Sequence, residues 1–184
     1  HNVTDRAGDV SSKNSYLTTL LDPTNNNYRG NTKTNEEARF HYYFLNKGEG
    51  GMTGDIEPNF LSLGRGDKFT GIIGMEEKEQ LVTYQENLLI LAESAARTKD
   101  FATALSHLNS FRDFMNSGGY IHSTYTTAFP VKYDPYIDAD FENNGMNNPE
   151  GIDKSQALLK EILEERYVTF FCQFLGFNDI RRTR

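Results

Sequence analysis

The sequence has no tryptophan, a single cysteine and no long apolar run. A membrane-spanning helix needs about 18 consecutive apolar residues, and none of the runs in this chain approaches that length. Cys172 has no second cysteine to pair with, which excludes an internal disulfide. Its position in an apolar helical pattern predicts a small core residue.

Basic residues are also few, with 19 Lys and Arg against 26 Asp and Glu and a net charge of −7. Binding to phosphate backbones needs a basic face, so this balance argues against a nucleic-acid function. With 184 residues, 37% of them hydrophobic, the chain is long enough to bury a core and predicts a single domain.

Motifs of common enzyme classes are absent from the sequence. It contains neither a Gly-x-x-x-x-Gly-Lys-Ser/Thr phosphate loop nor a Gly-x-Ser-x-Gly nucleophile turn, and its histidines lack metal-ligand spacing. Glu164 and Glu165 are adjacent on a predicted helix, so they cannot flank a glycosidic bond, and Glu161 with Glu165 predicts a solvated ridge. We therefore predict no enzyme, no cofactor and no metal.

The clearest helical pattern begins near the C-terminal end, after Asp153. Asp153 and Gln156 have the spacing of a capping box, so a helix should start at Lys154. Apolar residues recur every three or four positions up to Leu175, and those in 167–175 surround the helix, which predicts burial of that half. Gly176 is expected to end the helix, with residues 177–182 as a short tail.

Two further helices are predicted at 82–97 and 100–117, with Asp100 as the N-cap of the second. Because the turn between them is so short, they should pack antiparallel, in the manner of a tetratricopeptide-type hairpin. A shorter helix is predicted at 14–21, and the aromatic segment 38–45 is expected to be a strand or a buried extended segment.

Residues 118–152 form a long connection in which aromatic rings alternate with short polar side chains. Long ordered loops often carry function, and flat rings beside amide and carboxylate groups suit recognition of sugars. The alternative is that most rings pack over the helices. The predicted ligand-binding residues are Tyr120, Tyr125, Tyr133, Tyr136, Asn143 and Asn144.

Residues 140–151 partly match a calcium loop, with Asp140, Glu142 and Asn144 at the first, third and fifth positions. The twelfth position is Gly151 rather than an acid, so the set of oxygen ligands is incomplete. Calcium binding near Asp140 to Glu150 is left open by this pattern.

The string RYVTFFCQFLGFNDIRRT resembles the closing helix and Phe-Asn-Asp-x-Arg-Arg-Thr tail of the SusD/RagB-like nutrient-binding lipoproteins of Bacteroidetes. The two-helix pattern of that family, Tyr-x-Glu-x-x-x-Leu/Ile-x-Ala-Glu followed by Ala-x-x-x-Leu/Ile-Asn-x-x-Arg, is also similar. It falls here on Tyr84, Glu86, Ile90, Ala92, Glu93, Ala104, Leu108, Asn109 and Arg112.

The resemblance implies a mainly α fold with a tetratricopeptide-like hairpin, and a chain that is the C-terminal part of such a protein, without its N-terminal repeats and lipid anchor. It implies non-catalytic binding of an oligosaccharide or a peptide at the cell surface. The implied partner is a SusC-like TonB-dependent transporter in the outer membrane. The alternative, from another class, is a helical-repeat module that docks a protein without any small ligand.

Overall fold

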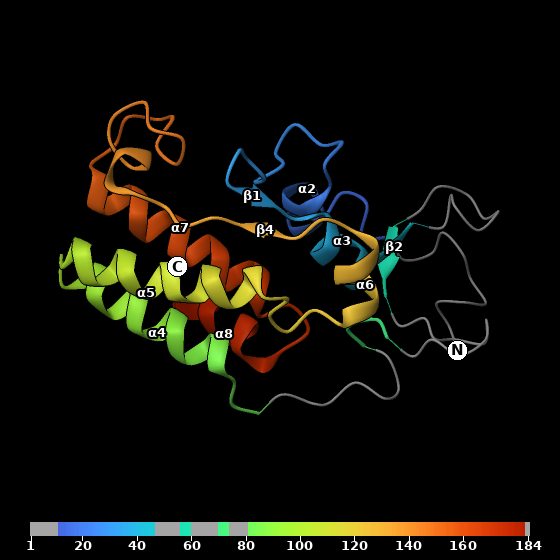
Figure 1. Cartoon of the computed structure of the whole chain (residues 1–184). Coiled ribbons are helices and arrows are strands. Elements are labelled where there is room, and N and C mark those ends of the chain that lie inside the picture. The colour runs from blue at the N-terminus through green and yellow to red at the C-terminus, as the bar shows by residue number, and fades with distance from the viewer. Residues whose placement is uncertain (1–10, 47–55, 60–69, 74–80, 183–184) are drawn as a thin grey trace. The chain divides into compact units, whose positions relative to one another are not determined.

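The computed structural model describes residues 11–46, 56–59, 70–73 and 81–182 (Figure 1). The chain is mainly helical, as the sequence predicts. It divides into two compact units, of which unit 1 comprises His1–Glu79 and Tyr120–Lys132, and unit 2 comprises Gln80–Gly119 and Tyr133–Arg184. Within the described ranges, no helix is long and apolar enough to cross a membrane.

Unit 1 is built from short elements around a small core. Its elements are α2 (Tyr16–Leu21), β1 (Thr34–Asn35), α3 (Glu37–Tyr43), β2 (Phe44–Asn46), β3 (Ile56–Pro58) and α6 (Ser123–Ala128). α3 packs against both α2 and α6, and β2 pairs antiparallel with β3. The unit ends at Lys132, where β4 (Lys132–Tyr133) begins, and the Nζ of Lys132 donates to the carbonyl oxygen of Thr32.

The aromatic segment 38–45 is mostly helical, so the prediction of an extended segment was wrong for its first part. α3 covers Glu37–Tyr43, and the chain becomes extended only at Phe44. The side chains of Ala38, Phe40 and Tyr43 are buried together with their neighbours, so no polar face marks the helical period. A short apolar run of this kind cannot be assigned to helix or strand by periodicity alone.

A buried ion cluster precedes α3 in unit 1. Glu36 is fully buried, with its carboxylate 2.7 Å from Arg29 Nη1 and 3.3 Å from Arg39 Nε. The main-chain N–H of Glu36 also donates to the hydroxyl of Tyr28 at 2.9 Å. Two guanidinium groups around one carboxylate offset the cost of burying it, which a single partner would do less well.

Unit 2 is organised around the antiparallel pair α4 (Tyr84–Arg97) and α5 (Phe101–Asn116), which lie side by side in Figure 1. α7 (Lys154–Thr169) packs against both. Asp100 and Asp153 accept hydrogen bonds from main-chain N–H groups at the starts of α5 and α7, as predicted. The short 3₁₀ helix η2 (Asp138–Asp140) lies in the connection between α5 and α7.

The C-terminal segment forms two helices, whereas the sequence analysis expected one helix and a tail. α7 ends at Thr169, Cys172 has a left-handed φ of 60°, and α8 (Phe174–Arg182) follows. Gly176 lies inside α8 and does not end a helix. A Cβ atom on Gly176 would lie 2.8 Å from the carbonyl oxygen of Phe170, so this glycine permits a close approach to the end of α7.

The structure corrects two predictions about burial in this C-terminal segment. Cys172 is exposed rather than part of the core, because it lies in the turn between the two helices. Desolvation by neighbouring atoms still raises the pKa of its thiol to about 11, so the reactive thiolate is scarce at neutral pH. Glu165 is 1% exposed and accepts a hydrogen bond from Thr169 Oγ1 at 3.0 Å, so it does not belong to a solvated ridge.

Candidate functional site

The six predicted ligand-binding residues belong to different units. Tyr120 and Tyr125 are in unit 1, and both are half-buried. Tyr133, Tyr136, Asn143 and Asn144 are in unit 2, where the two tyrosines are buried and the two asparagines are exposed.

Tyr120 packs next to the buried Tyr43 in unit 1. Their hydroxyl oxygens are 2.7 Å apart and their rings are stacked with centroids 6.5 Å apart. The guanidinium carbon of Arg39 lies 5.8 Å from the centroid of the Tyr120 ring. Burial, together with the nearby Tyr120 hydroxyl, raises the pKa of Tyr43 well above its usual range. Tyr120 therefore supports the core and retains part of its surface for contact with other molecules.

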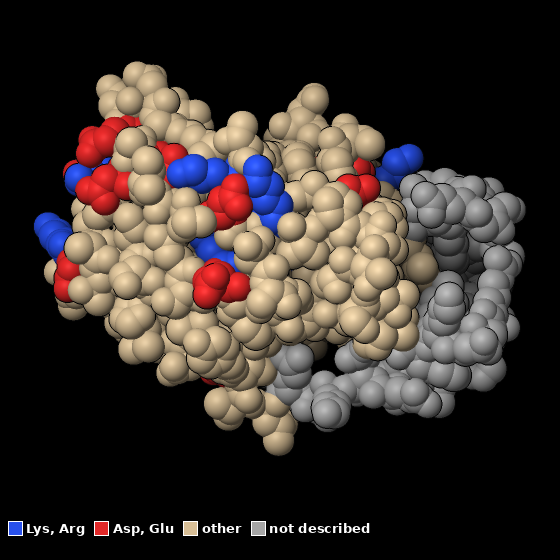
Figure 2. All heavy atoms as spheres, viewed as in Figure 1, with Lys and Arg blue, Asp and Glu red and all other residues tan. Residues whose placement is uncertain are grey.

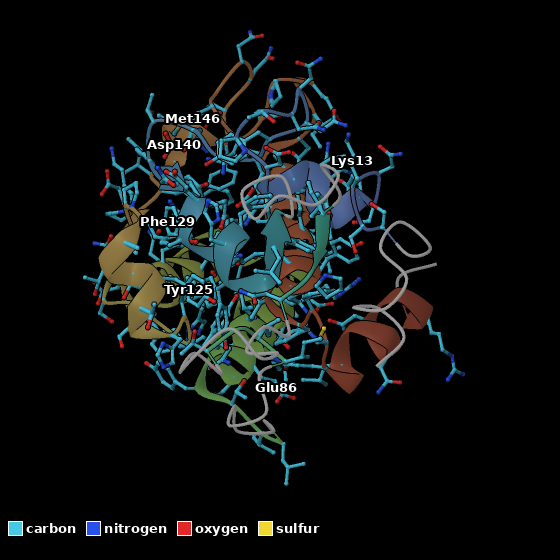
Figure 3. The ribbon with its side chains drawn as sticks, turned by 90° about the vertical axis from the view of Figure 1, so that its right-hand side faces the viewer. Lys13, Glu86, Tyr125, Phe129, Asp140 and Met146 are labelled. Atoms are coloured by element: carbon cyan, nitrogen blue, oxygen red, sulfur yellow. The ribbon has the colours of Figure 1, made fainter. Side chains whose placement is uncertain are left out.

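Tyr125 projects from α6 and is held by two hydrogen bonds (Figure 3). Its hydroxyl accepts from Asn59 Nδ2 at 2.7 Å and from Thr70 Oγ1 at 3.4 Å. At the end of α6, the ring of Phe129 stacks on His41 with centroids 3.8 Å apart and an interplanar angle of 8°. We call the half-buried rings of Tyr120, Tyr125, Phe129 and His41 the α6 ring cluster.

Tyr133 and Tyr136 are buried in unit 2 beside the guanidinium group of Arg112. Each is 2% exposed, and the Arg112 guanidinium lies 3.6 Å from the Tyr136 ring centroid and 5.9 Å from that of Tyr133. Arg112 is itself buried, and its Nε donates to the carbonyl oxygen of Asp134 at 2.7 Å. Neither ring presents a face on which a sugar could stack in this conformation.

Three polar side chains, spaced about one helical turn apart on α5, bind the main chain of residues 133–136. Asn116 Oδ1 accepts the N–H of Tyr133 at 3.1 Å, and Arg112 binds the next carbonyl oxygen as described above. Asn109 pairs with both main-chain groups of Tyr136, at 2.8 and 2.9 Å. Sequence reasoning missed this role, although Asn109, Arg112 and Asn116 have the spacing of one helical face.

Asn143 and Asn144 lie in the loop that follows η2, which is arranged around the buried Asn148. Asn148 Nδ2 donates to the carbonyl oxygens of Phe141 and Ile152 at 2.9 and 2.7 Å, and its Oδ1 accepts the N–H of Ile152 at 3.0 Å. Sequence analysis did not single out Asn148, because a buried asparagine that satisfies main-chain groups looks like any other loop asparagine in sequence.

The acids of this loop face lysine side chains. Lys154 Nζ lies 3.1 Å from Glu142 Oε1 and 3.5 Å from Asp138 Oδ2, and Lys160 pairs with Glu150. The nearby carboxylates of Glu142 and Asp138 raise the pKa of Lys154. The ammonium groups of Lys154 and Lys160 thus balance Glu142 and Glu150, two acids of the segment that partly matches a calcium loop. In the described ranges, no group of three or more His, Cys, Asp and Glu could hold a metal ion.

A second buried charge network joins α4, α7 and α8. Arg166 Nε lies 3.1 Å from Glu93 Oε2, and its two nitrogens donate to both carboxylate oxygens of Asp179 at 2.9 and 3.0 Å. Glu93 also binds Arg97 Nε at 2.7 Å. Arg166 of α7 therefore pairs with one carboxylate from α4 and one from α8.

Charged side chains of both signs alternate on the face drawn in Figure 2, and most of that face is uncharged. Among its described residues, this face carries no continuous basic surface of the kind that phosphate backbones require. Five large exposed apolar side chains of unit 2 lie at or just before α4, and they are Leu81, Val82, Tyr84, Ile90 and Leu91.

Comparison of this chain with known proteins identifies no relative. A scan against family models, a search of curated proteins and a search of solved structures each gave no significant match.

Proposed function

We propose that this chain is the C-terminal part of a SusD/RagB-like binding protein, with α4 and α5 as a tetratricopeptide-like hairpin. The observation that carries the proposal is that residues from motifs far apart in the sequence bind a common partner in the fold. Glu93 of the first helical motif and Asp179 of the tail motif both bind Arg166. Asn109 and Arg112 of the second motif anchor one connecting segment. Motif residues that contact one another support a shared origin better than scattered matches do.

The proposed activity is non-catalytic capture of an oligosaccharide or a peptide. The α6 ring cluster supplies partly exposed rings, and Asn143 and Asn144 supply exposed amides in the other unit. Rings and amides are the groups that recognise the C–H faces and hydroxyls of sugars. The proposed partner is a SusC-like TonB-dependent transporter, and the proposed location is the outer surface of the outer membrane, reached through a lipid anchor.

The test is a glycan and peptide array probed with the protein, followed by calorimetry on each ligand that binds. We expect saturable binding without turnover. Tyr120→Ala and Tyr125→Ala should each weaken binding of a glycan ligand about two- to tenfold, since contact with one aromatic face is worth about 0.5–1.5 kcal/mol. Tyr16→Ala is the matched control, because Tyr16 is an exposed tyrosine of unit 1 outside the α6 ring cluster.

Silence across the array, with folded protein by circular dichroism, would contradict nutrient capture. Binding that Tyr120→Ala and Tyr125→Ala leave unchanged would remove the α6 ring cluster from the site. The exposed asparagines of unit 2 would then be tested next, with Asn143→Ala and Asn144→Ala.

The alternative function, a module that docks a protein partner, is favoured by the apolar side chains at α4. Leu81 and Val82 are 83% and 86% exposed, and Ile90 and Leu91 are exposed on the helix itself. Isolated exposed apolar residues are ordinary, but several at one helix indicate a contact surface. Binding of the purified transporter that is lost in Ile90→Lys and retained in Ser106→Lys, at an exposed serine of α5, together with a silent array, would favour this alternative.

A further inference from the structure

The loop after η2 contains Asn144 and Gly145, the one Asn-Gly pair in the sequence. Asn144 is exposed and adopts a left-handed φ of 63°. Asparagine followed by glycine is chemically labile, because glycine has no Cβ to hinder attack of its nitrogen on the preceding side chain. The dipeptide is therefore a candidate for a covalent change that needs no enzyme.

We propose that Asn144 is a deamidation site and that its conversion is controlled by opening of this loop. In the reaction, the main-chain nitrogen of Gly145 attacks Cγ of Asn144 and a C–N bond forms. The bond from Cγ to Nδ2 breaks, and the side-chain nitrogen takes up the proton that the Gly145 nitrogen loses and leaves as ammonia. Water then opens the resulting succinimide ring to aspartate or isoaspartate. No electrons are transferred, and water is the one other reactant.

The closed loop holds the attacking nitrogen away from this reaction. The N–H of Gly145 donates to the carbonyl oxygen of Glu142 at 2.7 Å. A Cβ atom on Gly145 would lie 2.5 Å from the carbonyl oxygens of Ala139 and Asp140, so the glycine is packed against the chain of η2. The Gly145 nitrogen must lose this hydrogen bond before it can attack Asn144, and the packing of Gly145 against η2 limits its movement.

Asn148 is the residue that keeps the loop closed. It is 2% exposed and binds three main-chain groups across the base of the loop, as described above. A further main-chain hydrogen bond joins the N–H of Asn147 to the carbonyl oxygen of Asp140 at 2.8 Å. Figure 3 labels Asp140 and Met146 in this loop. Opening requires several of these bonds to break together, so the open form should be rare.

The product would not fit the closed loop. Isoaspartate adds one atom to the main chain just before Gly145, where the packing against Ala139 and Asp140 leaves no space. Either product also adds a negative charge to a loop that already carries Glu142 and Asp138. Conversion should therefore leave the loop open. This inference rests on the loop contacts alone and not on the proposed function.

The first experiment compares the intact chain with its own tryptic peptide 133–154, both incubated at mildly alkaline pH. Deamidation at Asn144 is followed by mass spectrometry after digestion. We expect conversion in the intact chain to be at least about tenfold slower than in the peptide, since the loop must open first. Equal rates would overturn the proposed control, and no conversion in the peptide would show that Asn144 is not a deamidation site.

The second experiment uses Asn148→Ala, which removes the three hydrogen bonds at the base of the loop. Conversion should become several-fold faster than in the unchanged chain, while Asn87→Ala, at an exposed asparagine of α4, should leave the rate unaltered. A rate in Asn148→Ala equal to that of the unchanged chain would overturn the role of the loop. If Asn148→Ala does not fold, the comparison of the unchanged chain with its peptide still decides the proposal.

Discussion

Replacing Arg166 by methionine should destabilise unit 2 by about 3–5 kcal/mol, because it removes the guanidinium that binds both Glu93 and Asp179 in a largely buried network. The side chains of Arg166, Glu93 and Asp179 are 4%, 5% and 15% exposed. Arg97 would still pair with Glu93, but Asp179 has Arg166 as its partner in the network described here. Methionine keeps much of the apolar stem of arginine and lacks only its guanidinium, which also lies 5.0 Å from the Phe170 ring centroid, so the loss should come mainly from charge.

The measurement is urea unfolding of the whole chain followed by far-ultraviolet circular dichroism, since the longest helices, α4, α5 and α7, all belong to unit 2. The matched control is Lys160→Met, which breaks the pair with Glu150, where both side chains are more than half exposed. An exposed pair contributes about 0–1 kcal/mol, so this control should change little.

The charge argument also predicts a non-additive double variant. Arg166→Met combined with Asp179→Asn should cost less than the sum of the two single changes, because each single change already removes the bidentate Arg166–Asp179 contact. An Arg166→Met cost below about 1 kcal/mol, similar to that of Lys160→Met, would refute the reasoning. Additive costs in the double variant would show that Arg166 and Asp179 do not interact in solution.

Three further changes test other parts of the fold. Phe170→Ala should cost about 3–5 kcal/mol in urea unfolding because Phe170 is buried, whereas Phe171→Ala should cost clearly less because Phe171 is only half-buried; equal costs would contradict these positions. Gly176→Ala should destabilise by about 1–3 kcal/mol, since its Cβ would meet the carbonyl oxygen of Phe170, and an unchanged midpoint would argue against the close approach of α8. The raised pKa of buried Tyr43 means that its contribution to stability is complete below about pH 10 and lost as the pH rises further. A pH titration of unfolding should show this loss, and Tyr43→Phe should reduce it, while Tyr28 and Tyr167, whose pKa values burial also raises, keep their smaller shares.

The helices of unit 2 could be predicted from sequence because their signals are local. Asp100 and Asp153 are caps directly before apolar residues at helical spacing, so both starts were predicted correctly. The break at Cys172 could not be predicted in this way. A left-handed cysteine is uncommon, and only the packing of α8 onto the end of α7 explains why the chain turns there.

The candidate site was harder to predict than the fold, because a tyrosine in a loop can face either the core or the solvent. Tyr133 and Tyr136 are buried and lie beside Arg112 of α5, which is distant from both of them in sequence. Nothing in the local pattern of residues 118–152 distinguishes them from Tyr120 and Tyr125, which keep part of their surface exposed. Long-range contacts decided which rings remain accessible.

The residues that carry the family resemblance serve the fold rather than a ligand. Glu93, Arg166 and Asp179 bind one another, and Asn109 and Arg112 are used in holding main-chain groups. Their hydrogen-bonding groups are directed to the protein itself. Ligand specificity would then come from exposed residues rather than from these five, which is why a correct family assignment would still leave the ligand unidentified and why the array precedes any mutagenesis of the motifs.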